Sequence, residues 1–197
     1  MRSSLILTWL AVLCIALSGC GKTPPSTFYV LDSANTVELE TPPACNLSVG
    51  IGPVSIPAYF DRTQLVTRSG KNTITIHEYD RWGDSFKKQV VETLAENISI
   101  LLQPSLVVLF PWERALRPTY QLVLTLHHFE GDIGKSINLK ATWRIIDVAS
   151  EKTLLASQYS KKHPIHGNDL SSYVATQSRA LADLSHQIAL CISSLSK

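Results

Sequence analysis

Residues 120–129 (YQLVLTLHHF), 137–148 (INLKATWRIIDV) and 153–161 (TLLASQYSK) follow one another with short connections. Apolar and polar residues alternate most clearly in the first of them, which is the pattern of a strand with one buried face. Asp147 to Lys152 forms a tight connection between the last two segments. These residues predict three long strands of a largely antiparallel sheet.

Two segments that flank these strands have apolar residues at helical spacing. In residues 84–102, charged side chains occupy the opposite face, and the apolar positions are Phe86, Val90, Leu94, Ile98 and Leu101. A longer helix is predicted from Leu170 to Leu195, and either Asn168 or Asp169 is expected to cap it.

Shorter β-prone segments precede the long strands. They are residues 28–31, residues 47–52, a hairpin of 64–68 with 73–79, and a buried strand at 106–110. Runs of strands with two amphipathic helices favour an α+β fold, in which both helices pack on one face of a largely antiparallel sheet.

The N-terminus has the pattern of an export signal. Arg2 precedes the apolar run Leu5–Leu17, which is short for a hydrocarbon core of about 30 Å and typical of a signal peptide. Leu17-Ser18-Gly19-Cys20 resembles a bacterial lipobox, in which the Cys thiol accepts a diacylglyceryl group. We therefore expect a signal peptide at 1–19, a lipidated Cys20 with a tether at 20–27, and a single domain at 28–197. The alternative is a plain secretory signal with an incidental cysteine.

The tether keeps the predicted domain near its membrane. From Cys20 to Phe28 the chain extends no more than about 28 Å, at ~3.5 Å per residue. The residue after the cysteine is Gly21, not the Asp that commonly retains such lipoproteins in the inner membrane. The lipobox resemblance therefore implies the outer membrane of a Gram-negative cell, facing the periplasm.

Two cysteines remain once Cys14 has left with the signal and Cys20 carries lipid. In an oxidising periplasm, Cys45 and Cys191 predict one disulfide that joins the start of the folded body to its end. The alternative is two separate buried thiols.

Composition and motifs exclude several classes of protein. An apolar fraction of 45% and a net charge of +2 fit a globular domain and exclude a disordered chain and a nucleic-acid binder. Residues 21–23 and 134–136 resemble the end of a phosphate-binding loop but lack the Gly five positions earlier. His127 and His128 are neighbours on a strand, so we expect them on opposite faces, unable to share a metal. No Gly-x-Ser-x-Gly or His-Glu-x-x-His occurs, and we expect no enzyme, metal or cofactor.

Two segments carry a family resemblance. Residues 49–62 (VGIGPVSIPAYFDR) and 78–84 (EYDRWGD), together with the lipobox and residues 28–32, resemble the PqiC-like auxiliary lipoproteins of ABC-type transport systems. The resemblance covers roughly residues 20–195. It implies a non-enzymatic outer-membrane component of an intermembrane lipid-transport system. Its partner would be a PqiB-like MCE-domain protein anchored in the inner membrane.

Docking to such a partner requires an exposed apolar or aromatic patch. Tyr59, Phe60 and Trp82 are candidates because they lie in or beside predicted turns. The basic candidates for acidic partner residues or lipid headgroups are Arg62, Arg68 and Arg81. The alternatives are aromatics that close the core and charges that are merely solvated. If the partner forms a tube between the two membranes, several copies of this chain would be needed to surround it, which suggests a homo-oligomer.

Two other functions stay open from the sequence. A periplasmic lipid carrier would hold its ligand in an apolar pocket between sheet and helices. A periplasmic hydrolase would gather a nucleophile, a base and oxyanion donors in one cleft.

Overall fold

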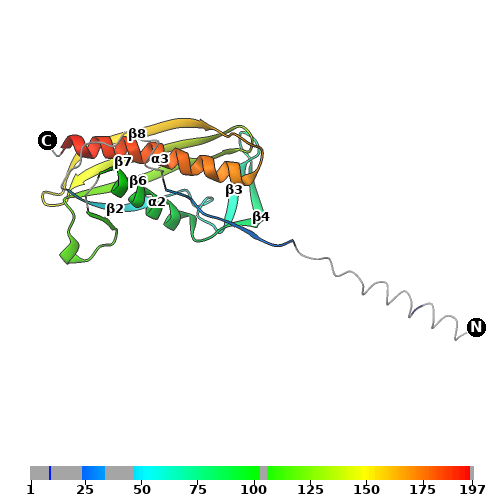
Figure 1. Ribbon diagram of the computed structural model, residues 1–197, viewed down its shortest axis with the longest axis horizontal. Coiled ribbons are helices and arrows are strands. Elements are labelled where there is room, and N and C mark those ends of the chain that lie inside the picture. The colour runs from blue at the N-terminus through cyan, green and yellow to red at the C-terminus, as the bar shows by residue number, and fades with distance from the viewer. Residues whose placement is uncertain (1–8, 10–23, 34–46, 103–105, 196–197) are drawn as a thin grey trace, which may run out of the picture.

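The computed structural model describes residue 9 and residues 24–33, 47–102 and 106–195. The larger of its two sheets has mixed pairing (Figure 1). Its strands, in spatial order, are β5 (Leu106–Leu109), β2 (Ser48–Ser55), β6 (Tyr120–Asp132), β7 (Ser136–Asp147) and β8 (Lys152–Pro164). The three long predicted strands form its antiparallel part, β6-β7-β8, whereas β2 pairs in parallel with β5 and with β6.

The smaller sheet has the order β1-β4-β3, with bounds Thr27–Tyr29 (β1), Ile74–Trp82 (β4) and Gln64–Arg68 (β3). β3 and β4 form the predicted antiparallel hairpin. β1, the first strand after the tether, pairs in parallel with the end of β4. The chain therefore joins the domain at this small sheet.

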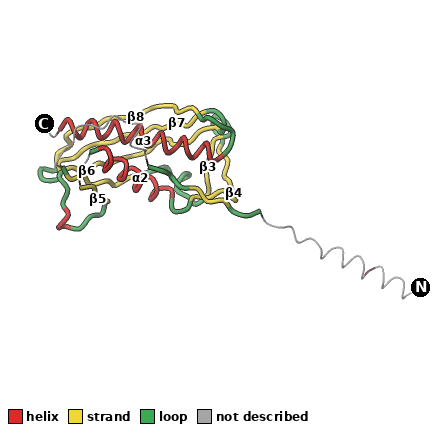
Figure 2. Tube along the Cα trace, viewed as in Figure 1, coloured by secondary structure: helices red, strands yellow, loops and turns green. Residues whose placement is uncertain are grey.

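Helices α2 (Phe86–Leu101) and α3 (Leu170–Leu195) pack against each other and on one face of the larger sheet (Figure 2). Ser85 caps α2 by accepting a hydrogen bond from the Lys88 N–H. The α+β fold with two helices on one face is confirmed. None of the helices among the described residues is both long and apolar enough to cross a membrane.

The core lies between the helices and the larger sheet. Phe86, Val90, Leu94 and Ile98 of α2 are fully buried there, together with the inward residues Leu122 and Leu124 of β6 and Leu139 and Ile145 of β7. The space in which a lipid carrier would hold its ligand is therefore filled by side chains.

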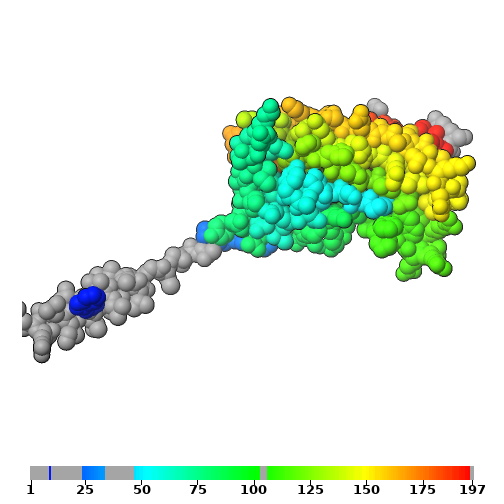
Figure 3. Space-filling model, turned by 180° about the vertical axis from the view of Figure 1, so that it is seen from behind, coloured from blue at the N-terminus to red at the C-terminus, as the bar shows by residue number. Residues whose placement is uncertain are grey.

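The two ends of the domain differ. The N-terminal chain leaves beside β3 and β4, whereas the C-terminal end of α3 and a projecting segment after β5 lie at the opposite end (Figures 1 and 2). A short 3-10 helix, η1 (Arg114–Leu116), lies within that segment. The view from behind shows the same segment projecting away from the N-terminal chain (Figure 3).

The prediction of a buried strand at 106–110 was wrong about its burial. β5 is an edge strand with one neighbour, β2, and Leu106 and Leu109 are 54% and 39% exposed.

Candidate functional site

The structure corrects the expected docking patch. Phe60 and Trp82 are only 2% and 4% exposed. Their ring centroids lie 5.0 Å and 4.8 Å from that of Phe86, whose ring also packs on Phe129 at 5.8 Å. Both side chains belong to an aromatic cluster in the core and offer no exposed apolar surface to a partner.

The remaining docking candidates are half-buried. The Tyr59 ring meets Phe60 edge to face at 5.7 Å, and the Arg81 Nε donates to the carbonyl of Glu78 at 3.1 Å. The Nε of Arg62 is buried and has no hydrogen-bond partner among the described residues. A contact of Tyr59, Arg62 or Arg81 with a partner stays a prediction.

The cysteine predictions fall largely outside the described residues, because these do not include Cys20 or Cys45. Cys191, near the end of α3, is half-buried and has no disulfide to another described residue, and burial raises the pKa of its thiol. Lipidation of Cys20 and a disulfide between Cys45 and Cys191 stay predictions.

The exposed apolar surface that the sequence analysis missed lies on residues 106–116, which we call the distal apolar segment. Its exposed apolar side chains are Leu106, Leu109, Phe110 and Leu116, with exposed fractions of 54%, 39%, 50% and 45%. The ring of Phe110 packs edge to face on that of Trp112 at 5.4 Å. Several exposed apolar side chains on one short segment make it a candidate interaction surface.

A glycine on β2 positions the distal apolar segment. A methyl group on Gly50 would lie 2.5 Å from Trp112 Cζ3 and 2.8 Å from Pro118 Cγ, so the segment folds back onto bare backbone. The Phe110 N–H also donates to the carbonyl of Ile51 at 2.9 Å. These contacts hold the middle of the segment against β2, and the signal in the sequence is the pair of aromatics around a proline, Phe110-Pro111-Trp112.

A buried ion pair joins the two sheets. Glu130, on β6, is 1% exposed, and its Oε1 accepts hydrogen bonds from Arg68 Nε at 2.9 Å and Nη2 at 2.8 Å. His128 Nδ1 lies 3.0 Å from the same oxygen, and the Phe129 N–H donates to Oε2 at 2.8 Å. Because Arg68 ends β3, this carboxylate fixes the hairpin to the larger sheet.

The hydrogen bonds to Glu130 keep it ionised. Burial raises the pKa of its carboxyl, but the hydrogen bonds from His128, Phe129 and Arg68, with the charge of Arg68, outweigh burial and hold the pKa below its usual value. The hydrogen bond to Glu130 in turn raises the pKa of Arg68. The pair is structural in character, since each group holds the other in its charged form.

The second polar cluster resembles an acid–base relay but lacks an activated nucleophile. Tyr159 Oη lies 3.3 Å from His163 Nε2, and His163 Nδ1 lies 3.7 Å from Asp183 Oδ2. Burial and the charge of Asp183 raise the pKa of Tyr159, so its hydroxyl is harder to ionise than in water. Burial also lowers the pKa of His163. The hydrolase alternative gains nothing from this cluster.

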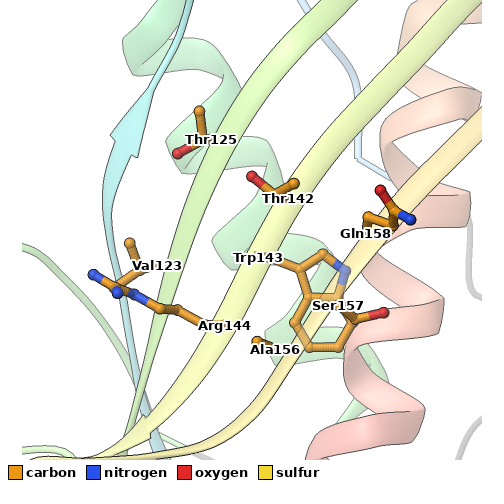
Figure 4. A pocket seen from close by; sticks show the side chains of 8 residues that line it. All are labelled: Val123, Thr125, Thr142, Trp143, Arg144, Ala156, Ser157 and Gln158. Atoms are coloured by element: carbon orange, nitrogen blue, oxygen red, sulfur yellow. The ribbon is translucent and has the colours of Figure 1, made fainter.

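The sheet face opposite the helices is open. A hollow of about 660 Å³ lies along β6, β7 and β8. Figure 4 shows the residues that line it: Val123, Thr125, Thr142, Trp143, Arg144, Ala156, Ser157 and Gln158. The Trp143 ring and short aliphatic side chains lie there beside hydroxyls, an amide and a guanidinium. The lining therefore mixes apolar and polar groups.

The two neighbouring histidines do not follow strand alternation. The register between β6 and β7 shifts between Leu126 and His128, and both rings contact groups of the open face. His127 Nε2 lies 3.0 Å from Thr142 Oγ1, and His128 bonds Glu130. The prediction of opposite faces was wrong, because a bulge interrupts the alternation. Among the described residues, no group of three or more His, Cys, Asp and Glu could hold a metal ion.

Comparison with known proteins gives a family match by sequence and two similar folds among solved structures. The model of the family described as ABC-type transport auxiliary lipoprotein component matches residues 29–189. No curated protein matches the sequence. A crystal structure of an uncharacterised protein is similar with a TM-score of 0.70 and 17% identity, covering 86% of this chain and 99% of the other. A Xanthomonas campestris protein of the DUF330 family model is similar with a TM-score of 0.70 and 12% identity, covering 86% of this chain and 97% of the other. These two structures share the fold.

Proposed function

The chain belongs to the family of ABC-type transport auxiliary lipoprotein components, and from this membership we propose that it is the outer-membrane docking subunit of an intermembrane lipid-transport system. A lipoprotein family implies a membrane-anchored chain, and this family is not an enzyme class. The proposed partner is a PqiB-like MCE-domain protein anchored in the inner membrane. The chain would act without catalysis.

The observation that carries this proposal is the separation of two features. The chain enters the domain at the small sheet, where a lipid on Cys20 would hold it at the membrane. The distal apolar segment projects at the opposite end (Figure 3). A partner that arrives from another membrane therefore meets exposed Phe110 and Leu116 first. Buried apolar and aromatic side chains supply most of the binding energy at protein interfaces.

A homo-oligomer is part of the proposal, because several copies could surround a tube-shaped partner. The packed core gives no support to a lipid carrier, and the Tyr159 cluster gives none to a hydrolase. The native mass of the purified chain, with and without the partner, tests the oligomer.

Crosslinking in cell envelopes tests the docking role. The wild-type chain should recover an MCE-domain protein, and Phe110→Ser should lower the yield about tenfold or more, since losing a buried aromatic anchor costs roughly 2 kcal/mol of binding. Phe28→Ser is the matched control: it removes an exposed phenylalanine, 65% exposed against 50%, at the tethered end. An equal loss in the two variants, or no MCE-domain protein with the wild type, would contradict the proposal.

A further inference from the structure

A basic cleft of about 400 Å³ lies where the hairpin meets the larger sheet. Its charged lining comes from three strands and two turns: Arg68 ends β3, Lys71 lies in the hairpin turn, Glu130 and Asp132 end β6, Lys135 lies in the turn to β7, and Lys162 lies on β8. Four basic and two acidic side chains give the lining an excess of two positive charges.

Strand register builds the floor of the cleft. Glu130 pairs with Asn138, and Asn138 pairs with Lys162, so these residues form one row across three strands. Arg68 closes this row from the side of the hairpin through its bonds to Glu130. The cleft is therefore set by the same pairing that holds the sheets together.

Two of the four basic side chains in the cleft form ion pairs with its carboxylates, and the other two do not. Glu130 pairs with Arg68 at 2.8 Å, and Asp132 pairs with Lys135 at 3.5 Å. Lys71 and Lys162 are exposed, and neither has an ion pair among the described residues. Their ammonium groups, with the Asn138 amide and the Ser136 hydroxyl beside them, are donors for an anion with several oxygens.

The cleft lies at the tethered end of the domain. The turn that carries Lys135 contacts the segment leading into α3, since the Ile165 N–H donates to the Lys135 carbonyl at 3.0 Å. α3 begins at the end where the N-terminal chain leaves (Figure 1). β3, which carries Arg68, pairs with β4, and β4 pairs with β1. A membrane that anchors this end brings its phosphate groups close to the cleft.

We propose that the basic cleft binds a phosphate group, either that of an anionic phospholipid headgroup or free phosphate. The surplus positive charge of Lys71 and Lys162 selects an anion over a zwitterion. The proposal is independent of partner docking, because the cleft and the distal apolar segment share no residue.

Titration of the full chain in neutral detergent tests the site. The probes are short-chain phosphatidylglycerol, short-chain phosphatidylcholine and inorganic phosphate, and the readout is the amide shift of Gly70 and Gly131, which line the cleft. We expect saturable shifts with phosphatidylglycerol that weaken as salt is added. If phosphatidylglycerol binds more tightly than phosphate, the ligand of the cleft is a lipid headgroup. If phosphatidylglycerol binds equally or more weakly, the ligand is free phosphate.

Two double variants decide the result. K71Q/K162Q should weaken binding about tenfold or more, because each lost charge-assisted hydrogen bond costs close to that factor. K87Q/K152Q removes the same charge from exposed positions outside the cleft and should bind like the wild type. Equal weakening in both variants, equal binding of phosphatidylcholine and phosphatidylglycerol, or no shift with any probe would overturn the proposal.

Discussion

Glu130 shows how one side chain ties the two sheets together. A buried carboxylate is costly unless it is paired and hydrogen-bonded. Here Arg68, His128 and the Phe129 N–H all contact it. The adjacent Gly131 N–H donates to Tyr173 Oη at 3.2 Å, and Tyr173 donates to the carbonyl of Val66 at 3.1 Å. The hairpin, β6 and α3 therefore share one polar network.

Glu130→Gln should lower the free energy of unfolding by about 2 kcal/mol, because hydrogen bonds to a charged group are lost and Arg68 keeps an unpaired charge. Denaturant unfolding at neutral pH measures this loss. Glu96→Gln is the control, because Glu96 is exposed on α2 without an ion pair among the described residues. If the two variants lose equal stability, Glu130 does not join the sheets.

The same variant should change the response to acid. The folded pKa of Glu130 lies below its ordinary value of 4.5, so its contribution to stability is fully present above that pH and is lost as the pH falls through the folded pKa. Wild-type stability should fall more steeply than that of Glu130→Gln when the pH drops below about 4.5. Parallel curves from thermal melts at several pH values would contradict this assignment.

At the residue scale, the sequence singled out the aromatic side chains beside the turns, but it did not predict whether they are buried or exposed. Phe60 and Trp82 lie beside turns, and aromatics beside turns occur both at interfaces and over cores. Their burial depends on Phe86 arriving from α2, which is a contact between segments distant along the chain. The partners of Glu130 likewise come from β3 and from a bulge that local alternation does not reveal.

A side-chain cap fixes the point at which helix α3 begins. The Asp169 carboxylate accepts a hydrogen bond from the Ser172 N–H at 2.6 Å. That bond lowers the pKa of Asp169. Of the two predicted caps, Asn168 and Asp169, the structure selects Asp169.

Asp169→Ala should lower the free energy of unfolding by about 1 kcal/mol, the usual cost of losing a helix N-cap. Asn168→Ala is the matched control and should change it by less than about 0.5 kcal/mol, as an exposed side chain away from the cap does. Chemical denaturation compares the two. A larger loss for Asn168→Ala would reverse the assignment of the cap.

At the element scale, the hairpin and both helices were predictable because their signals are local: turn residues between β-prone runs, and apolar residues at helical spacing. The parallel pairing of β2 with β5 and β6 was not, since it joins segments separated by a helix. The exposure of β5 follows from its position at the edge of the sheet, which its four apolar residues do not reveal.

For the whole molecule, the sequence predicted one domain attached through its N-terminus, and the fold gives that attachment a direction. The predicted tether would join at β1, and the distal apolar segment lies at the other end of the domain (Figure 1). A signal in the first twenty residues cannot indicate which end of the fold will face the membrane, because that depends on where β1 pairs.

The predicted disulfide would constrain the whole chain. Cys191 lies near the end of α3, and a bond to Cys45 would close a loop that nearly spans the domain. The chain-entropy model gives such a loop about 5 kcal/mol of stabilisation. We expect the mature, denatured protein to label no thiol with a maleimide before reduction and two thiols after it.

Cys45→Ser and Cys191→Ser separate the bond from simple burial. If the two sulfurs are bonded, each variant opens the same loop, so both should lose the same stability and both should expose one labelled thiol without reductant. If they are separate thiols, each loss depends on its own surroundings, and the wild type labels twice without reductant. Unequal losses of stability in the two variants, together with two labelled thiols in the unreduced wild type, would contradict the disulfide. The fold would then be held by its core and by the Glu130 network.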